Sequence, residues 1–175
     1  MDTDDPLELE WRRRIFDRIT QNPGTHFREL QRLLDVPVGM LDYHLKYLEK
    51  RGLVTSKSEE HYTRYYAASA FDPASKEILS FLRQELPRGI ILYVMMHPGC
   101  THGQVLESID VTGATLSYHL KRMGTAGVIK AEKSGRETML NVTEPEKVAD
   151  LLITHRRSFL DNLVDGFVSA WLAKR

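Results

Sequence analysis

The chain has 175 residues, of which 42% are hydrophobic and 27% charged, proportions typical of a globular protein with one or two domains. The 24 Lys and Arg balance the 24 Asp and Glu, so net charge alone does not indicate a nucleic-acid partner. The longest apolar run is too short to cross a bilayer, the acidic N-terminus lacks a signal-peptide core, and one cysteine excludes an internal disulfide. These features predict a cytoplasmic protein.

The first part of the chain is predicted to form three helices and a hairpin. Apolar residues recur at helical spacing, and the helices are expected at about 7–21, 27–34 and 38–50. Pro23-Gly24 ends the first helix, Thr25 caps the second, and Gly52 ends the third. In the second helix, Leu30, Leu33 and Leu34 are expected to face inward. Two β-favouring runs, 53–58 and 62–68, then flank a polar centre, which indicates a hairpin.

This pattern is repeated 75 residues later. When 22–54 is aligned with 97–129 without gaps, ten of the 33 positions are identical. The matched pairs are Pro23/Pro98, Gly24/Gly99, Asp35/Asp110, Val36/Val111, Leu41/Leu116, Tyr43/Tyr118, His44/His119, Leu45/Leu120, Lys46/Lys121 and Gly52/Gly127. The repeat predicts two copies of one small domain.

The second copy is expected to have helices at about 88–97, 101–109 and 113–126, followed by a hairpin at 128–133 and 137–142. A helix over 73–86 is predicted to join the copies. The final segment, 144–174, is interpreted as one long helix that begins with a capping box of Thr143 and Glu146.

Three helices followed by a hairpin, with a short turn between the second and third helices, is the order of a winged helix-turn-helix domain. The segments His26-Phe27-Arg28-Glu29-Leu30 and Tyr43-His44-Leu45-Lys46, with their second-copy partners, resemble tandem winged helix-turn-helix transcriptional regulators of ArsR-like and archaeal types. The expected fold is mainly α, with small β-hairpin wings. The domains are 7–71 and 88–143, a linker helix at 72–87, and a C-terminal dimerisation helix at 144–175.

The repeated Leu-x-Tyr-His-Leu-Lys stretch divides by helix face. Leu41, His44, Leu45 and Leu48 form an inward stripe, in which the histidine is interpreted as structural, bonding a neighbouring helix or turn. The outward residues can meet a major groove and the wings can meet the backbone. The predicted DNA contacts of the first copy are Gly39, Tyr43, Lys46, Tyr47, Lys57 and Arg64. Those of the second are Thr115, Ser117, Tyr118, Lys121, Arg122, Lys133 and Arg136.

The copies differ on the outward face, because Asp42 stands where the second copy has Ser117. A carboxylate opposes a phosphate backbone, so the second copy is predicted to have the more conventional recognition face. The first has a broader basic flank, although Arg12-Arg13-Arg14 is at least as well explained as a solvated face. The favoured function is a DNA-binding homodimeric regulator. The alternative is a tandem winged-helix scaffold that binds protein.

The last segment carries a wide apolar face that predicts dimerisation through Phe159, Leu160, Leu163, Val164, Phe167 and Trp171. The alternative is that this segment folds back on the linker helix of its own chain. His97, Cys100 and His102 have metal-like spacing but too few ligands, so a turn is preferred. Met95 and Met96 are interpreted as core rather than pocket. No cofactor and no catalytic motif is predicted, and an enzyme is not expected.

Overall fold

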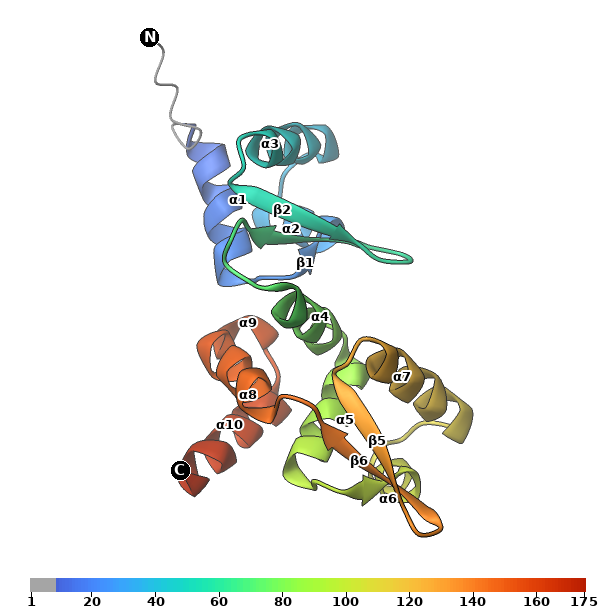
Figure 1. The fold of residues 1–175 in the computed structure, drawn as a ribbon. Coiled ribbons are helices and arrows are strands. Elements are labelled where there is room, and N and C mark those ends of the chain that lie inside the picture. The colour runs from blue at the N-terminus through green and yellow to red at the C-terminus, as the bar shows by residue number, and fades with distance from the viewer. Residues whose placement is uncertain (1–8) are drawn as a thin grey trace. The chain divides into compact units, whose positions relative to one another are not determined.

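The computed structural model describes residues 9–175, which form two compact units divided after Asp72 (Figure 1). Each unit contains the same succession of helix, short strand, two helices and hairpin. In each unit the short strand and the hairpin form a three-stranded antiparallel sheet with the last strand in the middle. The predicted helix-turn-helix order with a β-hairpin wing is therefore present.

The first unit consists of α1 (Glu10–Gln21), β1 (Thr25–His26), α2 (Phe27–Leu34), α3 (Val38–Lys50), β2 (Val54–Ser58) and β3 (Thr63–Ala67). Its core is the stripe predicted from helical spacing, because Leu41, Leu45 and Leu48 of α3 are fully buried with Ile15 and Ile19 of α1. Helix α3 spans the predicted residues. It ends where Gly52 adopts a φ of 72°, a conformation that side chains with a Cβ disfavour.

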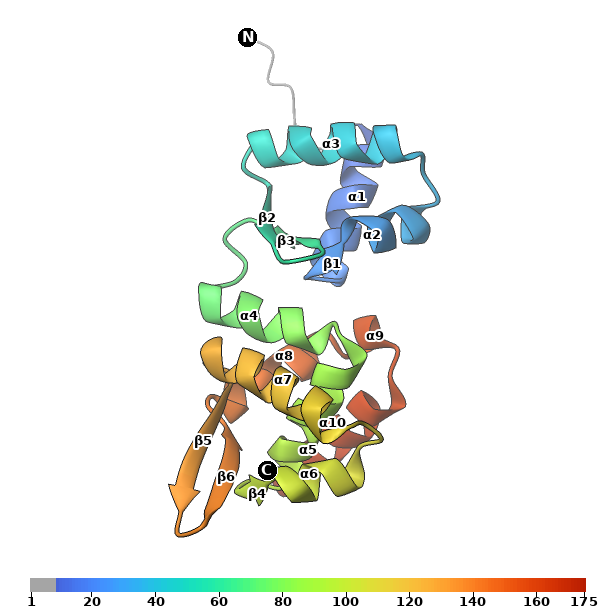
Figure 2. The same cartoon turned by 90° about the vertical axis from the view of Figure 1, so that its right-hand side faces the viewer.

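The second unit begins with α4 (Pro73–Leu82) and α5 (Glu85–Met96) and continues through the second sheet (Figure 2). Its next elements are β4 (Cys100–Thr101), α6 (His102–Ser108), α7 (Gly113–Thr125), β5 (Ile129–Ser134) and β6 (Glu137–Val142). It closes with α8 (Pro145–Thr154), α9 (Arg156–Phe159) and α10 (Asn162–Lys174). Helix α4 packs against α8, and α10 packs against α5 and α8.

Two predicted helix caps and one predicted core position were wrong, although α2 spans the predicted residues 27–34. Thr25 lies in β1, and the cap of α2 is His26, whose Nδ1 accepts the amide of Glu29 at 3.3 Å. Leu33, predicted to face inward, is exposed. Thr143 does not cap α8, since Glu144 precedes that helix and its side chain makes no capping bond. Leu7, where the first helix was expected to begin, lies outside the described residues, and α1 begins at Glu10.

The prediction of one joining helix over 73–86 was also wrong. The helix stops at Leu82, and a new helix, α5, starts at Glu85 after an extended Gln84 with a ψ of 128°. The two helices pack against each other. Because α5 begins three residues before the predicted start at Arg88, that arginine lies inside α5 and is buried.

The C-terminal segment is three helices rather than one long helix. His155 leaves the helical region with a ψ of 19°, and Leu160 adopts a left-handed φ of 50°, so the chain turns twice. Helix α10 then starts anew, with the Asp161 carboxylate accepting the Leu163 amide at 2.8 Å. Helical spacing alone does not reveal such turns, because apolar residues continue across them.

The turns fold this segment back on its own unit, the alternative considered from the sequence. Phe159, Val164 and Phe167, predicted to contact a second subunit, are buried in the second unit instead. Leu160 and Leu163 remain 92% and 65% exposed, and Trp171 is partly buried. The predicted dimerisation face is therefore smaller than the sequence suggested and lies around the α9–α10 corner.

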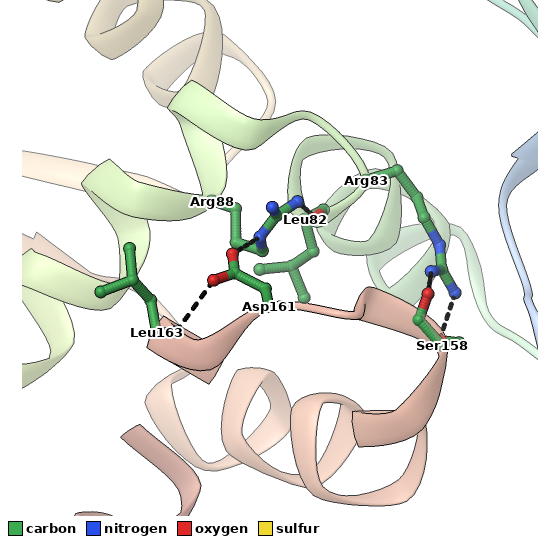
Figure 3. Close-up of polar contacts among 6 residues, drawn as sticks. All are labelled: Leu82, Arg83, Arg88, Ser158, Asp161 and Leu163. Atoms are coloured by element: carbon green, nitrogen blue, oxygen red, sulfur yellow. Dashed lines mark hydrogen bonds and ion pairs between the residues drawn. The ribbon is translucent and has the colours of Figure 1, made fainter. Parts of the chain in front are cut away.

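Two arginines hold that corner in place (Figure 3). Arg88 of α5 donates from Nε to Asp161 at 2.6 Å and from Nη1 to the carbonyl of Leu82 at 3.0 Å. Arg83 donates from Nη1 to the carbonyl of Ser158 at 3.1 Å and from Nη2 to its hydroxyl at 2.9 Å. Asp161 therefore joins the start of α10 to α5.

Candidate nucleic-acid interface

Helix α7 presents a polar face to solvent. Leu116 and Met123 are fully buried beneath it, whereas Ser117, Tyr118 and Lys121 are exposed. The helix contains no Asp or Glu, so its outward face combines hydroxyl groups with a positive charge. Such a face can donate hydrogen bonds to phosphate oxygens and to base edges.

The start of α7 is fixed by a network of hydroxyl groups. Thr112 caps the helix by accepting the amide of Thr115 at 3.2 Å, and the two threonine hydroxyls lie 2.9 Å apart. The Ser117 hydroxyl shares a hydrogen bond of 3.0 Å with Nε2 of His102, at the start of α6. These bonds orient two of the predicted DNA contacts, Thr115 and Ser117, before any ligand binds.

Arg122 lies at the side of this face rather than on it. Its guanidinium carbon is 5.6 Å from the ring centres of both Phe81 and Tyr118, in cation–π contact with each. The residue is half-buried, so α4 and α7 together restrict the arginine. Its positive charge nevertheless stays beside the exposed phenol of Tyr118.

The hairpin of the second unit adds two exposed bases. Lys133 and Arg136 flank Ser134-Gly135, and Gly135 adopts a φ of 64° that suits a tight turn. Figure 2 shows this hairpin extending away from the helices of the second unit. A groove of about 480 Å³ lies between α7 and the hairpin. Ser117 and Lys121 of α7 line one wall, and Thr138 of β6 lines the other.

The outward face of α3 in the first unit is electrostatically different. The Lys46 ammonium forms an ion pair of 2.7 Å with Asp42, one turn earlier, so its charge is partly neutralised. Tyr47 is covered, because the guanidinium carbon of Arg12 lies 3.5 Å from its ring centre. Tyr43 and Gly39 are the predicted contacts on α3 that remain open to solvent without such a contact.

Arg64, predicted to contact DNA, is buried and bonded within the first unit. Its side chain is 3% exposed and forms a 3.0 Å ion pair with Glu59, while Nη1 donates to the carbonyl of Gly24 at 2.9 Å. Arg64 lies in β3, the middle strand of the sheet, where residues on both faces are buried. Lys57, its neighbour across the hairpin, is half-buried.

Two contacts near these faces were not recognised in the sequence. Arg12 is buried over Tyr47, whereas its neighbour Arg13 is exposed. The bond between His102 and Ser117 was also missed. The sequence held a signal for this bond. In the first copy, Phe27 stands at the position of His102 and Asp42 at the position of Ser117, so both members of the pair are replaced.

The repeated histidines are structural in position but differ from the prediction in bonding. His44 is buried and His119 half-buried, and within residues 9–175 the Nδ1 atom of each is buried with no hydrogen-bond partner. Burial lowers the pKa of both imidazoles, and the guanidinium of Arg12 or of Arg122 lowers it further. Burial is also the main cause that lowers the pKa of His26 and His155.

The metal-like cluster is spread over separate contacts. His97 packs on Tyr93 with ring centres 4.4 Å apart, Cys100 is buried in β4, and His102 bonds Ser117. Burial raises the pKa of the Cys100 thiol. In the described part of the chain, no three His, Cys, Asp or Glu side chains are grouped to hold a metal ion.

The helices within residues 9–175 are all too short or too polar to span a membrane.

Comparison with known proteins agrees with this architecture. Residues 9–79 match the family HTH_HVO_0163_N, described as an N-terminal HTH domain. An uncharacterised HTH-type transcriptional regulator of Methanocaldococcus jannaschii is 30% identical over 145 residues, which cover 82% of this chain and 36% of that protein. The chain therefore spans about a third of this relative's length.

Among solved structures, an ArsR family transcriptional regulator aligns with 50% of this chain and 92% of its own, at 17% identity and a TM-score of 0.38. The family match covers the first unit from α1 and continues into α4. The first unit is therefore similar to this N-terminal HTH family, and the chain as a whole is similar to an HTH-type transcriptional regulator.

Proposed function

We propose that this chain is a transcriptional regulator that binds double-stranded DNA sequence-specifically, with α7 as its principal reading helix. An α-helix fits the major groove of B-DNA, about 12 Å wide. Ser117, Tyr118 and Lys121 would face the base edges and the adjoining phosphates. Lys133 and Arg136 at the hairpin turn would contact the backbone or the minor groove.

The observation that carries this proposal is the exposed, carboxylate-free face of α7. DNA affinity rests on pairing positive groups with phosphates, and each misplaced carboxylate opposes it. The capping threonines and His102 hold this face in one orientation, so little ordering is needed on binding. A helix with these properties can supply both affinity and base selection.

Helix α3 is proposed to play a secondary part. It would present Gly39 and Tyr43 to a neighbouring groove, but the pairing of Lys46 with Asp42 reduces its attraction for phosphate. The basic surface of this unit, which includes the exposed Arg13 and Arg28, would add non-specific attraction.

We further propose that the regulator acts as a homodimer. Leu160 and Leu163 lie close together at the α9–α10 corner, and both are exposed to solvent. Adjacent exposed apolar side chains mark a surface that contacts another protein. Two chains related by a two-fold axis would place two copies of α7 on half-sites about one helical turn apart.

Selection from a pool of random duplexes tests this function. The wild-type chain is expected to enrich a pseudo-palindromic sequence, and the enriched duplex should bind more tightly than a shuffled one in fluorescence anisotropy. The proposal would be contradicted by a chain that enriches no sequence and that causes no rise in the anisotropy of mixed duplex DNA.

A second candidate function is a protein-binding scaffold, favoured by one feature of the first unit. Leu33, Val38 and Tyr43 are exposed near the α2–α3 turn, beside the neutralised Asp42–Lys46 pair. If the chain binds no duplex at low salt but forms a stable complex with a protein through these residues, this second function is correct.

A further inference from the structure

The second unit contains a groove that its own side chains leave open. The groove has a volume of about 800 Å³ and runs along one face of α5 from Glu85 to His97, about 18 Å at 1.5 Å per residue. Its other walls are the turn 108–111 and the first residues of α10. An elongated channel bounded by helices has the form of a site that accepts a helix or a helical corner.

Two helical glycines line this groove. Gly89 lies in the middle of α5 and Gly166 in the middle of α10, where glycine is among the least favourable residues. A Cβ atom built on either glycine would meet nothing within 4 Å in this chain. Packing within the chain therefore does not require glycine at these positions, whereas close approach of another backbone would.

The chain carries a matching projection at the same place. Leu163 lies in the wall of the groove, and Leu160, which is 92% exposed and has a left-handed backbone, lies two residues before α10. Figure 3 shows Leu163 on the α10 side of the Arg88–Asp161 pair, with its side chain directed away from Asp161. The corner is therefore an exposed apolar projection whose base is hydrogen-bonded to Arg83 and Arg88.

The charges of groove and corner are complementary. Glu85 and Asp110 lie in the groove, and Arg157, exposed, lies three residues before Leu160. A surface with both a cavity and the projection that fits it is self-complementary, as a two-fold interface requires.

We infer that the groove along α5 is the site where a second copy of this chain inserts its α9–α10 corner. In this arrangement Leu160 of the partner subunit enters near Gly89, and the partner's Arg157 approaches Glu85, with the reciprocal contacts formed at the same time. This inference rests on the proposed homodimer and gives it a defined interface.

The position of the groove links dimerisation to DNA binding. Residues 108–111 form both a groove wall and the turn that leads into Thr112, the cap of α7. A partner seated there buttresses the reading helix. Dimer formation and DNA binding are then coupled, so each should strengthen the other.

Sedimentation velocity on the full chain tests the interface, first with two interface variants and one control. Gly89→Gln fills the groove at an open helical position, and Leu160→Asn removes the projection with a residue that tolerates a left-handed backbone. Gly103→Gln is the matched control, since Gly103 is an exposed residue of α6 outside the groove. Circular dichroism of each variant checks that it is folded.

Gly89→Gln and Leu160→Asn should each weaken dimerisation about tenfold or more, and Gly103→Gln should not. The single reversal Arg157→Glu should also weaken the dimer, and adding Glu85→Arg should restore it, which loss of folding would not do. Dimers of unchanged affinity in Gly89→Gln and Leu160→Asn would overturn the interface and leave a homodimer formed elsewhere. A wild-type chain that is monomeric at micromolar concentration would overturn both, whatever its affinity for DNA.

Discussion

Arg88 and Asp161 lie 73 residues apart in the sequence and form an ion pair of 2.6 Å in the interior of the second unit. Each partner has a second task. Arg88 also bonds the carbonyl of Leu82, and Asp161 also caps α10 through the amide of Leu163. One carboxylate therefore sets where α10 begins and how it lies on α5.

Removing one member of this pair should destabilise the second unit. The side chains are 11% and 16% exposed, so Arg88→Met leaves a largely buried carboxylate without its partner. We expect a loss of about 2–4 kcal/mol in the free energy of unfolding, measured by urea denaturation. Asp161→Asn should be milder, because an asparagine still caps α10.

The matched control is Lys130→Met, which breaks the exposed Lys130–Glu132 pair and should change stability by less than about 0.5 kcal/mol. Equal effects of Arg88→Met and Lys130→Met would show that the buried pair does not hold the corner.

Arg64 should matter for stability and not for DNA. Arg64→Met removes the buried contacts to Glu59 and to the Gly24 carbonyl, with an expected loss of about 2–4 kcal/mol. Arg136→Ala, at the exposed turn of the other hairpin, should leave the melting temperature unchanged. Thermal unfolding followed by circular dichroism compares the two. A normal melting temperature for Arg64→Met would contradict the structural role.

The elements that the sequence predicted correctly depend on local patterns. The stripe of Leu41, Leu45 and Leu48, and the stop at Gly52, follow from helical spacing and from backbone sterics within one helix. The hairpins follow from β-favouring runs around polar turns. The repeat then extended each inference to the second copy.

The elements that were missed depend on contacts between distant residues. No residue beside Leu160 signals its left-handed backbone, and the attachment of Asp161 to α5 depends on Arg88, 73 residues away in the sequence. In the sequence Arg64 resembles any basic residue of a wing, and its burial depends on the Gly24 carbonyl, 40 residues away, and on the pairing of β3 with both β1 and β2. Arg12 and Arg64 were assigned to exposed faces, but both are buried, as is Arg88.

Stability should fall as the solution is acidified below about pH 6.5. Burial lowers the pKa of His26, His44, His119 and His155 from their usual 6.5 in the folded chain. The unfolded chain then binds more protons than the folded one below that pH. The contribution of these neutral histidines to the free energy of unfolding is fully present above about pH 6.5. It is lost as the pH falls toward their lowered pKa values in the folded chain.

Denaturant titrations across this range measure the effect. The double variant His44→Leu/His119→Leu should show a smaller fall in stability between about pH 6.5 and pH 5 than the wild type. A wild-type stability that is constant over this range would contradict the burial of these imidazoles.

Exchanging the residue that distinguishes the two reading helices should change DNA affinity. Ser117→Asp gives α7 the carboxylate of α3, removes the serine hydroxyl bonded to His102 and sets a negative charge against phosphate. We expect binding to weaken about ten- to hundredfold, which corresponds to about 1.4–2.8 kcal/mol. Ser117→Ala, which adds no charge, should weaken it less. Anisotropy with the selected duplex measures both, and equal losses would argue against electrostatic repulsion.

The central claim is that the second unit supplies the main DNA-binding surface, and the salt dependence of binding tests it most directly. The double variant Lys121→Ala/Arg136→Ala removes one base from α7 and one from its hairpin. Its matched counterpart, Lys46→Ala/Lys57→Ala, does the same in the first unit. Each lost phosphate contact should flatten the slope of log Kd against log salt by about 1.

We predict that the slope falls by about 2 for Lys121→Ala/Arg136→Ala and by clearly less for Lys46→Ala/Lys57→Ala, because Asp42 already partly neutralises Lys46. An unchanged slope for the second-unit variant, or a larger loss for the first-unit variant, would contradict the account.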